Sequence, residues 1–130
     1  MVGVEIDQKL VESAARNLAR NMCGNAHVLC CQAESFCKKV LREKRVRVPN
    51  VGECVFDCIL VDPPRAGLDA TTLSLTALYS HVIYISCNPS SLHRDLQVLC
   101  DTHDILRYCV LDHFPYTRHV ECACYCRKRS

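Results

Sequence analysis

The chain has 130 residues, 49% of them hydrophobic, which is enough to bury the core of one domain and too apolar for a disordered protein. A formal net charge of +2 is too small to indicate nucleic-acid binding by charge alone. No apolar run is long enough to cross a membrane, and the sequence after Met1 lacks a secretory signal pattern, so we expect an intracellular protein without a membrane partner. The compartment, whether cytoplasm, nucleus or mitochondrion, is left open.

The chain is rich in cysteine, with 12 thiols, and in a reducing compartment these stay free. Three groups invite a metal: Cys30-Cys31, Cys54-x3-Cys58 and Cys122-x-Cys124-x-Cys126. None of them has the paired C-x2-C knuckles of a zinc site. We therefore expect no metal site, and we expect the last three cysteines to share one face of a strand, where small apolar side chains pack well.

The first half of the chain alternates short strands and helices. Val2–Ile6 predicts a strand, and Asp7 can cap the helix that follows. The apolar positions of this helix fall on one face: Leu10, Val11, Ala14, Ala15 and Leu18. His27–Cys31 predicts a second strand and Glu34–Glu43 a second helix. The charged segment Arg45–Glu53 carries Pro, Asn and Gly and predicts a loop.

The second half continues the alternation. Val55–Val61 is apolar apart from Asp57, as expected of a strand covered on both faces, and it stops at Asp62-Pro63-Pro64. The elements expected after it are a helix from Thr71 or Thr72 to Tyr79, a strand around Val82, a helix after Ser91, and strands near Ile105–Leu111 and Val120–Tyr125. Alternating strands and helices predict an α/β fold with a parallel sheet wrapped on both faces.

The stretch Tyr84–Leu96, YISCNPSSLHRDL, joins a strand to a helix through Cys87. Asn88 and Pro89 end the strand, and Ser90 or Ser91 can cap the helix. The unpaired amides at a helix start favour a thiolate over a thiol, so Cys87 is a candidate nucleophile. The alternative is a small hydrophobic residue buried at a strand end.

Ligands of parallel α/β sheets bind beyond the carboxyl ends of the strands. Glu5, Asp62 and Cys87 all fall at that edge. An acid that ends an early strand can accept hydrogen bonds from a ribose, as in nucleotide-binding α/β units. For Glu5 the alternative is a helix-capping or surface acid.

Three phrases, in this order, resemble the catalytic domain of the RNA 5-methyluridine methyltransferases: LVDPPRAGLD at 60–69, YISCNPSSLHRDL at 84–96 and DHFPYTRHVE at 112–121. The resemblance covers nearly the whole chain. It implies an α/β, Rossmann-like class I methyltransferase sheet with helices on both faces, and it implies that residues 1–130 form the carboxyl-terminal part of a single catalytic domain. Family members carry a first strand and a glycine-rich loop before the G-x-E strand, and we expect these to be lacking here, because Met1 directly precedes Val2-Gly3-Val4-Glu5.

The resemblance also assigns roles to single residues. Cys87 corresponds to the nucleophile and Glu121 to the general base. Glu5, Asp62 and Gln32 correspond to the S-adenosyl-L-methionine site, and Gln32 stands where the family usually has Asn or Asp. Without the resemblance, the preferred interpretation of Glu121 is a charged residue that interrupts an apolar strand at its exposed edge.

The chemistry explains these residue types. Carbon 5 of uracil is a poor nucleophile, and a thiolate added to carbon 6 turns the ring into an enolate that can take a methyl group. A carboxylate must then remove the proton from carbon 5. The target base must also leave its stack, and four residues are candidates to hold it, each with an alternative as a salt-bridge, capping or core residue: Arg65, Arg94, Phe114 and His119.

The resemblance therefore implies methylation of carbon 5 of uridine in RNA, with tRNA expected before rRNA, through a covalent cysteine adduct. The alternative is a catalytically silent methyltransferase-fold domain that binds RNA or a partner. In either case we expect an amino-terminal RNA-binding region or a partner chain to supply parts that these 130 residues lack.

Overall fold

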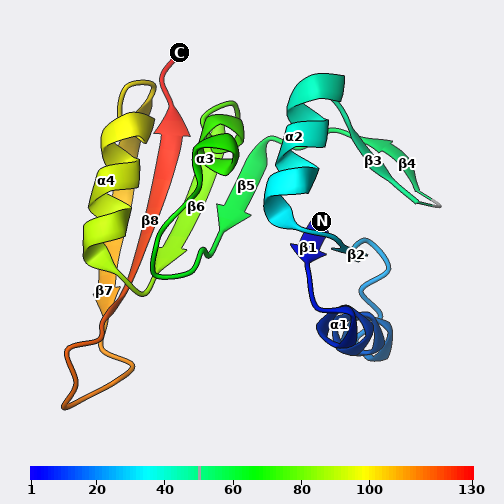
Figure 1. The fold of residues 1–130 in the computed structure, drawn as a ribbon, viewed down its shortest axis with the longest axis horizontal. Helices are drawn as coiled ribbons and strands as arrows, with labels where there is room; N and C mark the ends of the chain where they lie inside the picture. Colours follow the sequence, from blue (N-terminus) through cyan, green and yellow to red (C-terminus); the bar gives the residue numbers. More distant parts are fainter. Residues whose placement is uncertain (50) are drawn as a thin grey trace. The chain divides into compact units, whose positions relative to one another are not determined.

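The computed structural model describes residues 1–49 and 51–130 and divides into two compact units, Met1–Val55 and Phe56–Ser130 (Figure 1). In each unit, strands and helices alternate along the chain for most of its length. None of the described helices is both long enough and apolar enough to span a bilayer.

The first unit begins with a parallel pair of strands, each followed by a helix. The elements are β1 (Val2–Glu5), α1 (Gln8–Arg20), β2 (His27–Cys30) and α2 (Ala33–Glu43). β1 and β2 pair in register from Val2 opposite His27 to Glu5 opposite Cys30. The expected cap of α1 is confirmed, because Oδ1 of Asp7 accepts a hydrogen bond from the Lys9 N–H at 2.7 Å.

The last element of the first unit along the chain is a small antiparallel hairpin, formed by β3 (Val46–Val48) and β4 (Gly52–Cys54). The prediction of a loop over Arg45–Glu53 is therefore wrong, apart from Asn50, which lies outside the described residues. Val46 and Val48 are buried on either side of exposed Arg47, which is the period-2 pattern of a strand. The charged residues between the apolar ones obscured this two-residue apolar period in the sequence.

The second unit is built on a four-stranded sheet in the order β5-β6-β8-β7. Its strands are β5 (Cys58–Val61), β6 (His81–Ser86), β7 (His103–Leu111) and β8 (Glu121–Lys128). β5 and β6 are parallel, whereas β8 runs antiparallel to both β6 and β7. The expected all-parallel sheet is thus wrong at its carboxyl-terminal end, because the loop 112–120 turns the chain back without a crossover helix.

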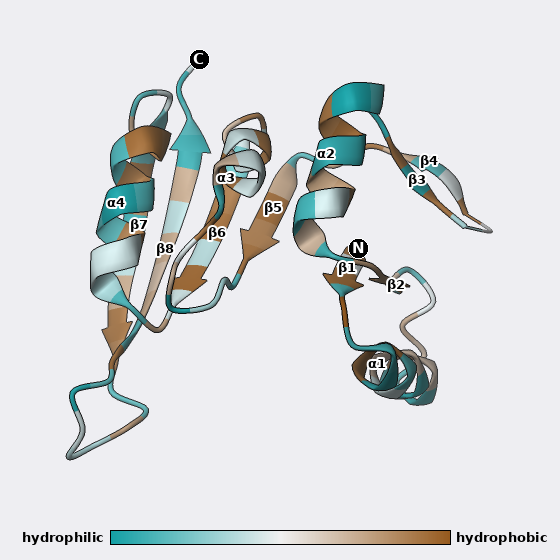
Figure 2. Ribbon diagram, in the orientation of Figure 1, coloured by the Kyte–Doolittle hydropathy of each residue, from teal (hydrophilic) through white to brown (hydrophobic). Residues whose placement is uncertain are grey.

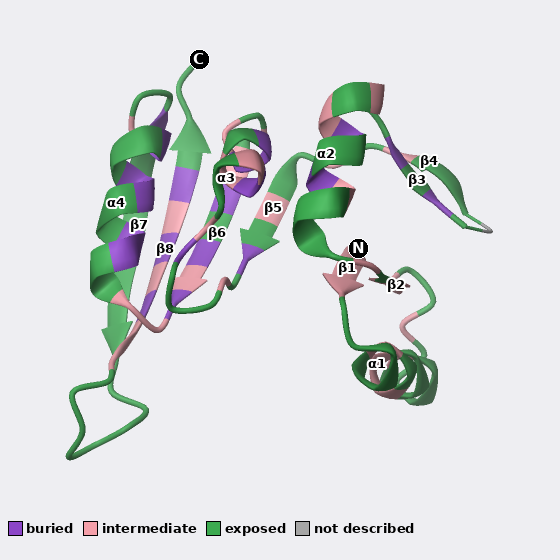
Figure 3. Ribbon diagram, viewed as in Figure 1, coloured by how far each residue is buried: buried purple, intermediate pink, exposed green. Residues whose placement is uncertain are grey.

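Helices α3 (Ala70–Thr76) and α4 (Pro89–Leu99) cover one face of this sheet (Figures 1 and 3). The buried core between them comprises Val61, Val82, Tyr84, Leu92, Leu96, Leu99, Cys122, Cys124 and Cys126. The three cysteines of β8 share this face, as expected. On the other face Leu60 is 60% exposed, so within this unit the β5 strand is not covered on both faces, although it is strongly apolar (Figure 2).

The two helices of the second unit begin slightly earlier than expected. α3, expected to start at Thr71 or Thr72, starts at Ala70 and is capped by Asp69, whose Oδ1 accepts from the N–H groups of Thr71 and Thr72 at 2.9 and 3.0 Å. Asn88 caps α4 by accepting from the Ser90 N–H at 3.1 Å, and Pro89 occupies the first helical position. A proline is well suited there, because its missing N–H has no partner to lose.

Candidate active site

The three phrases of the second unit meet at one edge of its sheet. In the β6–β8 ladder, Ser86, the last residue of β6, lies opposite Cys122. Cys87, directly after β6, and Glu121, the first residue of β8, therefore lie at the same end of these two paired strands. Glu121 is paired with Leu111, the last residue of β7. Asp62 follows β5 at the same edge, because β5 is parallel to β6. Cys87 and Glu121 are half-buried and Asp62 is exposed, so all three can be reached from solvent.

The backbone on both sides of Cys87 is fixed by hydrogen bonds. The hydroxyl of Ser86, which is buried, accepts from the Asn88 N–H at 3.1 Å and donates to the Asn88 carbonyl at 3.0 Å. The Ser91 hydroxyl donates to the same carbonyl at 3.0 Å. Cys87 therefore sits at a rigid junction between β6 and α4 rather than in a loose loop.

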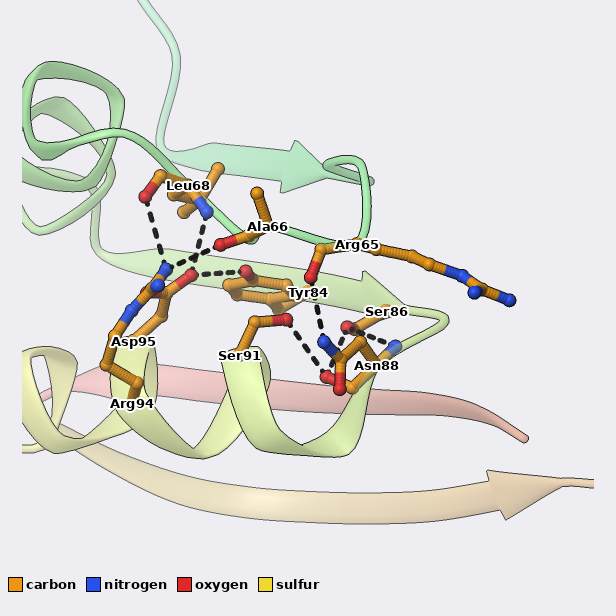
Figure 4. Close-up of polar contacts among 9 residues, drawn as sticks. All are labelled: Arg65, Ala66, Leu68, Tyr84, Ser86, Asn88, Ser91, Arg94 and Asp95. Carbon is orange, nitrogen blue, oxygen red and sulfur yellow. Dashed lines mark hydrogen bonds and ion pairs between the residues drawn. The ribbon is translucent and has the colours of Figure 1, made fainter. Parts of the chain in front are cut away.

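The segment 62–69 is held against the start of α4 (Figure 4). Nδ2 of Asn88 donates to the Arg65 carbonyl at 2.8 Å. Gly67, at φ 80°, lies so close to α4 that an added Cβ would come within 2.5 Å of Nη2 of Arg94 and 2.7 Å of Oδ2 of Asp95. Only glycine fits both this backbone conformation and this approach.

Asp95 is the centre of this contact, and its side chain is fully buried. Its Oδ2 accepts from the Tyr84 hydroxyl at 2.6 Å and from the Leu68 N–H at 2.8 Å. Its Oδ1 accepts from Nε and Nη2 of Arg94 at 2.9 and 2.7 Å. Burial and the hydrogen bond to Asp95 raise the pKa of Tyr84 well above its usual range.

The sequence reasoning missed Asp95. A signal was present, because Asp95 follows Leu92 by three residues and precedes Leu99 by four, which places an acid on the apolar face of α4. An acid on a buried face needs donors, and these come from β6 and the 62–69 segment. The guanidinium of Arg94 forms a salt bridge with Asp95 and donates to the Ala66 carbonyl at 2.9 Å. Of the two interpretations of Arg94, a residue that holds the target base or a salt-bridge residue, the structure therefore shows the second.

The two loops that flank the Cys87 edge also touch each other. Nη2 of Arg65 lies 2.8 Å from Nδ1 of His119. The rings of Phe114 and His119 meet edge to face, with centroids 6.5 Å apart. Three of the four residues expected to hold the target base, Arg65, Phe114 and His119, thus lie close together.

The first unit brings Glu5 and Gln32 to the carboxyl ends of its two parallel strands. Oε1 of Glu5 accepts from the Asp7 N–H at 2.9 Å, and the cap of α1 is Asp7, not Glu5. Gln32 is exposed at the start of α2, where Oε1 accepts from the Ser35 hydroxyl at 3.4 Å. Carboxylate and amide oxygens are acceptors suited to ribose hydroxyls and an adenine amine, so these residues fit a nucleoside cofactor.

A pocket of about 430 Å³ lies elsewhere in the first unit, and no candidate site residue lines it. Its walls come from Lys39, Arg47, Val48, Pro49, Gly52 and Glu53. Within the part of the chain that the structure describes, no three His, Cys, Asp or Glu side chains are grouped to hold a metal ion.

Comparison with known proteins identifies the family. The sequence model of the tRNA (Uracil-5-)-methyltransferase family matches residues 1–129. A tRNA/tmRNA (uracil-C(5))-methyltransferase of Pseudoalteromonas translucida is 38% identical over 133 aligned residues, covering 100% of this chain and 36% of the relative. The corresponding protein of Chromohalobacter salexigens is 41% identical, with the same coverage of 100% and 36%. The chain thus spans little more than a third of the length of these curated relatives.

Solved structures agree with the sequence matches. The Pyrococcus abyssi tRNA (uracil-54, C5)-methyltransferase, in complex with S-adenosyl-L-homocysteine, is 28% identical at a TM-score of 0.72, covering 96% of this chain and 28% of that one. TrmN from Thermus thermophilus, 16% identical at a TM-score of 0.63 over 98% of this chain and 36% of its own, shares the fold. The expected Rossmann-like class I methyltransferase fold is confirmed, and the chain belongs to the tRNA (uracil-5-)-methyltransferase family.

Proposed function

We propose that the protein transfers a methyl group from S-adenosyl-L-methionine to carbon 5 of uridine in RNA, with tRNA as the substrate class. The observation that supports the proposal is the pairing of β6 with β8, because Cys87 follows the last residue of β6 and Glu121 begins β8, so both residues lie at the same accessible edge of the sheet. A thiol and a carboxylate at one edge of the sheet are suited to serve as the nucleophile and the base that uracil C5 chemistry requires. Membership of the family supports the choice of substrate.

In the proposed reaction, the Cys87 thiolate adds to carbon 6 of uracil, and the electron pair of the C5–C6 double bond moves into an enolate. Carbon 5 would then take the methyl group as the sulfur–methyl bond breaks, with the electron pair of that bond remaining on the sulfur of the departing thioether. The Glu121 carboxylate takes the proton from carbon 5, the C5–C6 double bond re-forms, and the bond between Sγ and carbon 6 breaks. Cys87 leaves as a thiolate, ready for the next cycle.

The residues proposed to hold S-adenosyl-L-methionine are Glu5, Gln32 and Asp62. When bound, the cofactor supplies an activated methyl group on its sulfonium. Glu5 keeps Oε2 available for a ribose hydroxyl while Oε1 accepts from the Asp7 N–H. Gln32 is one carbon longer than the Asn usual in the family, and its amide extends from an exposed helix start.

The uracil must leave its stack before a thiolate can reach carbon 6. The residues proposed to receive it are His119 and its two contacts beside the Cys87 edge, Arg65 and Phe114. An amino-terminal RNA-binding region or a partner chain would add further RNA contacts. We place the protein inside the cell and treat residues 1–130 as the carboxyl-terminal part of a single catalytic domain.

The nucleophile is tested by trapping with RNA that carries 5-fluorouridine, in which fluorine replaces the proton that the base must remove. The test uses the protein with any segment encoded in frame before Met1. Wild type should form a covalent protein–RNA adduct that survives a denaturing gel, and Cys87→Ala should form none. Cys109→Ala is the matched control, because Cys109 is an exposed thiol in β7. An adduct that persists in Cys87→Ala would refute the assignment.

The base is tested on ordinary uridine RNA. Glu121→Gln keeps the side-chain volume but cannot take the proton from carbon 5. The methylated adduct should therefore accumulate in this variant, and product release should slow by about 100-fold or more. If Glu121→Gln turns over as fast as wild type, the general base lies elsewhere.

A further inference from the structure

The loop 112–120 carries one residue whose conformation the fold does not explain. The Thr117 N–H donates to the Phe114 carbonyl at 3.1 Å, closing a four-residue turn with Pro115 in its second position. Tyr116, in the third position, has φ 68°. Proline second and a positive φ third are the features of a type II turn, in which the third residue is usually glycine. The left-handed backbone conformation is strained for a tyrosine, whereas a glycine adopts it without strain.

The side chain of Tyr116 gains nothing from the fold in return. Its relative exposure is 105%, the highest of the large hydrophobic residues that the structure leaves exposed. Other tyrosines of the second unit have partners: Tyr84 donates to Asp95, and Tyr125 stacks on His81. Among the described residues, no side chain hydrogen-bonds to or stacks on Tyr116. A strained backbone that displays a bare aromatic ring points to a ligand rather than to stability.

The turn is nevertheless held firmly. The Thr117 hydroxyl donates to the Phe114 carbonyl at 2.7 Å and accepts from the His119 N–H at 3.1 Å. His119 in turn contacts Arg65 at 2.8 Å. The ring of Tyr116 is thus presented from a braced turn rather than from a loose one.

The turn also lies at the edge of the sheet that carries Cys87. The loop connects Leu111 to Glu121, two residues paired with each other, and Cys122, the next residue after Glu121, is paired with Ser86, which directly precedes Cys87. Arg65 and Arg118 are exposed beside the turn and supply positive charge for a phosphate backbone. Exposed aromatic rings flanked by basic groups are how proteins bind unstacked RNA bases.

We propose that Tyr116 is a stacking platform for an unstacked base of the RNA segment that enters the Cys87 edge. This inference rests on the proposed function and adds a residue to it. The ring supplies an apolar face that any base can cover, so the contact contributes affinity and positioning rather than sequence readout. The turn constraint holds the ring outward before RNA arrives, which lowers the entropy lost on binding.

The test measures binding of a fluorescein-labelled RNA stem–loop, with uridine in its loop, by fluorescence anisotropy. The protein again includes any segment encoded in frame before Met1. Tyr116→Gly suits the left-handed backbone and removes the ring, so the fold should be at least as stable as wild type. RNA affinity should nevertheless fall about tenfold, the effect of losing one aromatic–base stack. Tyr116→Phe keeps the ring and should bind as wild type does, whereas Tyr116→Leu should resemble the glycine variant.

Met22→Gly is the matched control, because Met22 is also left-handed, at φ 55°, and 91% exposed. It should leave RNA affinity unchanged. The inference is overturned if Tyr116→Gly binds within about twofold of wild type, or if that variant unfolds more easily. If wild type traps 5-fluorouridine RNA while Tyr116→Gly binds normally, only this inference fails; if wild type binds no RNA, the proposed function fails as well.

Discussion

Replacing Asp95 by alanine is the most direct test of how the 62–69 segment is held against α4. The carboxylate is fully buried and accepts four hydrogen bonds from Tyr84, Leu68 and Arg94. Alanine removes the acceptor but leaves the donors in place. The Tyr84 hydroxyl, on a residue with 0% exposure, would then have no partner and no water.

The cost follows from the donors that are left unpaired. A buried donor without an acceptor costs about 1–3 kcal/mol, and two are stranded here, the Tyr84 hydroxyl and the Leu68 N–H. The Arg94 side chain is 57% exposed and can turn to solvent, so it adds little. We expect Asp95→Ala to lower the free energy of unfolding by about 3–5 kcal/mol.

Urea unfolding followed by tyrosine fluorescence measures this effect in the right part of the chain. All 5 tyrosines lie in the second unit, Phe56–Ser130, and the chain has no tryptophan. The signal therefore reports on the unit that contains Asp95. Tyr84 itself is one of the five, so circular dichroism should accompany fluorescence in variants that change it.

Tyr84→Phe completes a double-mutant cycle. By itself it removes one donor and should cost about 1–1.5 kcal/mol. In the Tyr84→Phe background, Asp95→Ala strands one donor fewer, so its cost should fall by about 1–2 kcal/mol. Strictly additive losses, or an Asp95→Ala loss below about 1 kcal/mol, would refute the account of Asp95 as a buried acceptor.

Two further changes test the same region. Gly67→Ala should destabilise the second unit by about 2 kcal/mol or more, because φ 80° disfavours alanine and the added Cβ would clash with Arg94 and Asp95. Gly24→Ala is the control, because the space around Gly24 is open, and it should change the urea midpoint little. Equal effects of the two substitutions would contradict the steric argument. Burial acts to raise the pKa of Asp69, but hydrogen bonds from the Thr72 hydroxyl, the Thr72 N–H and the Thr71 N–H outweigh burial and lower it below its usual range. The fold therefore prefers the charged form: its stabilisation is present above about pH 4, the ordinary value of an aspartate, and is lost as pH falls through the lowered pKa. Asp69→Ala should cost about 1 kcal/mol at neutral pH. Asp69→Ser should keep the cap and flatten the acid dependence of the thermal midpoint, and an unchanged acid slope would assign that dependence to other groups.

Much of the fold followed from local patterns. β1, β2 and α2 lie within a residue or two of their predicted ranges, and α1 begins at its predicted cap, Asp7, because apolar periodicity and caps are local signals. The β3–β4 hairpin was missed because two strands of three residues carry too little periodicity to outweigh their charges. The direction of β8 was missed because an apolar run has the same appearance in parallel and antiparallel pairing.

The candidate site divides in a similar way. Glu5, Asp62 and Cys87 could be placed at strand ends from the sequence, since a strand end is visible where apolar residues stop. That Cys87 and Glu121 lie at the same edge of the sheet depends on the pairing of β6 with β8, which joins segments distant in the sequence and has no local signal. The roles of these residues, and of Gln32, stay predictions. Asp95 could have been found by asking why an acid lies on the apolar face of α4.

The way the loop 112–120 is attached has a consequence for how such a protein can diverge. Its two ends, Leu111 and Glu121, are tied to each other by strand pairing, so the loop can lengthen, shorten or change composition while Glu121 keeps its place beside β6. An insertion within β8, by contrast, would shift Glu121 relative to β6 and turn alternate side chains to the wrong face. If the proposed function holds, selection for new RNA substrates can therefore act on this loop while leaving the proposed nucleophile and base untouched.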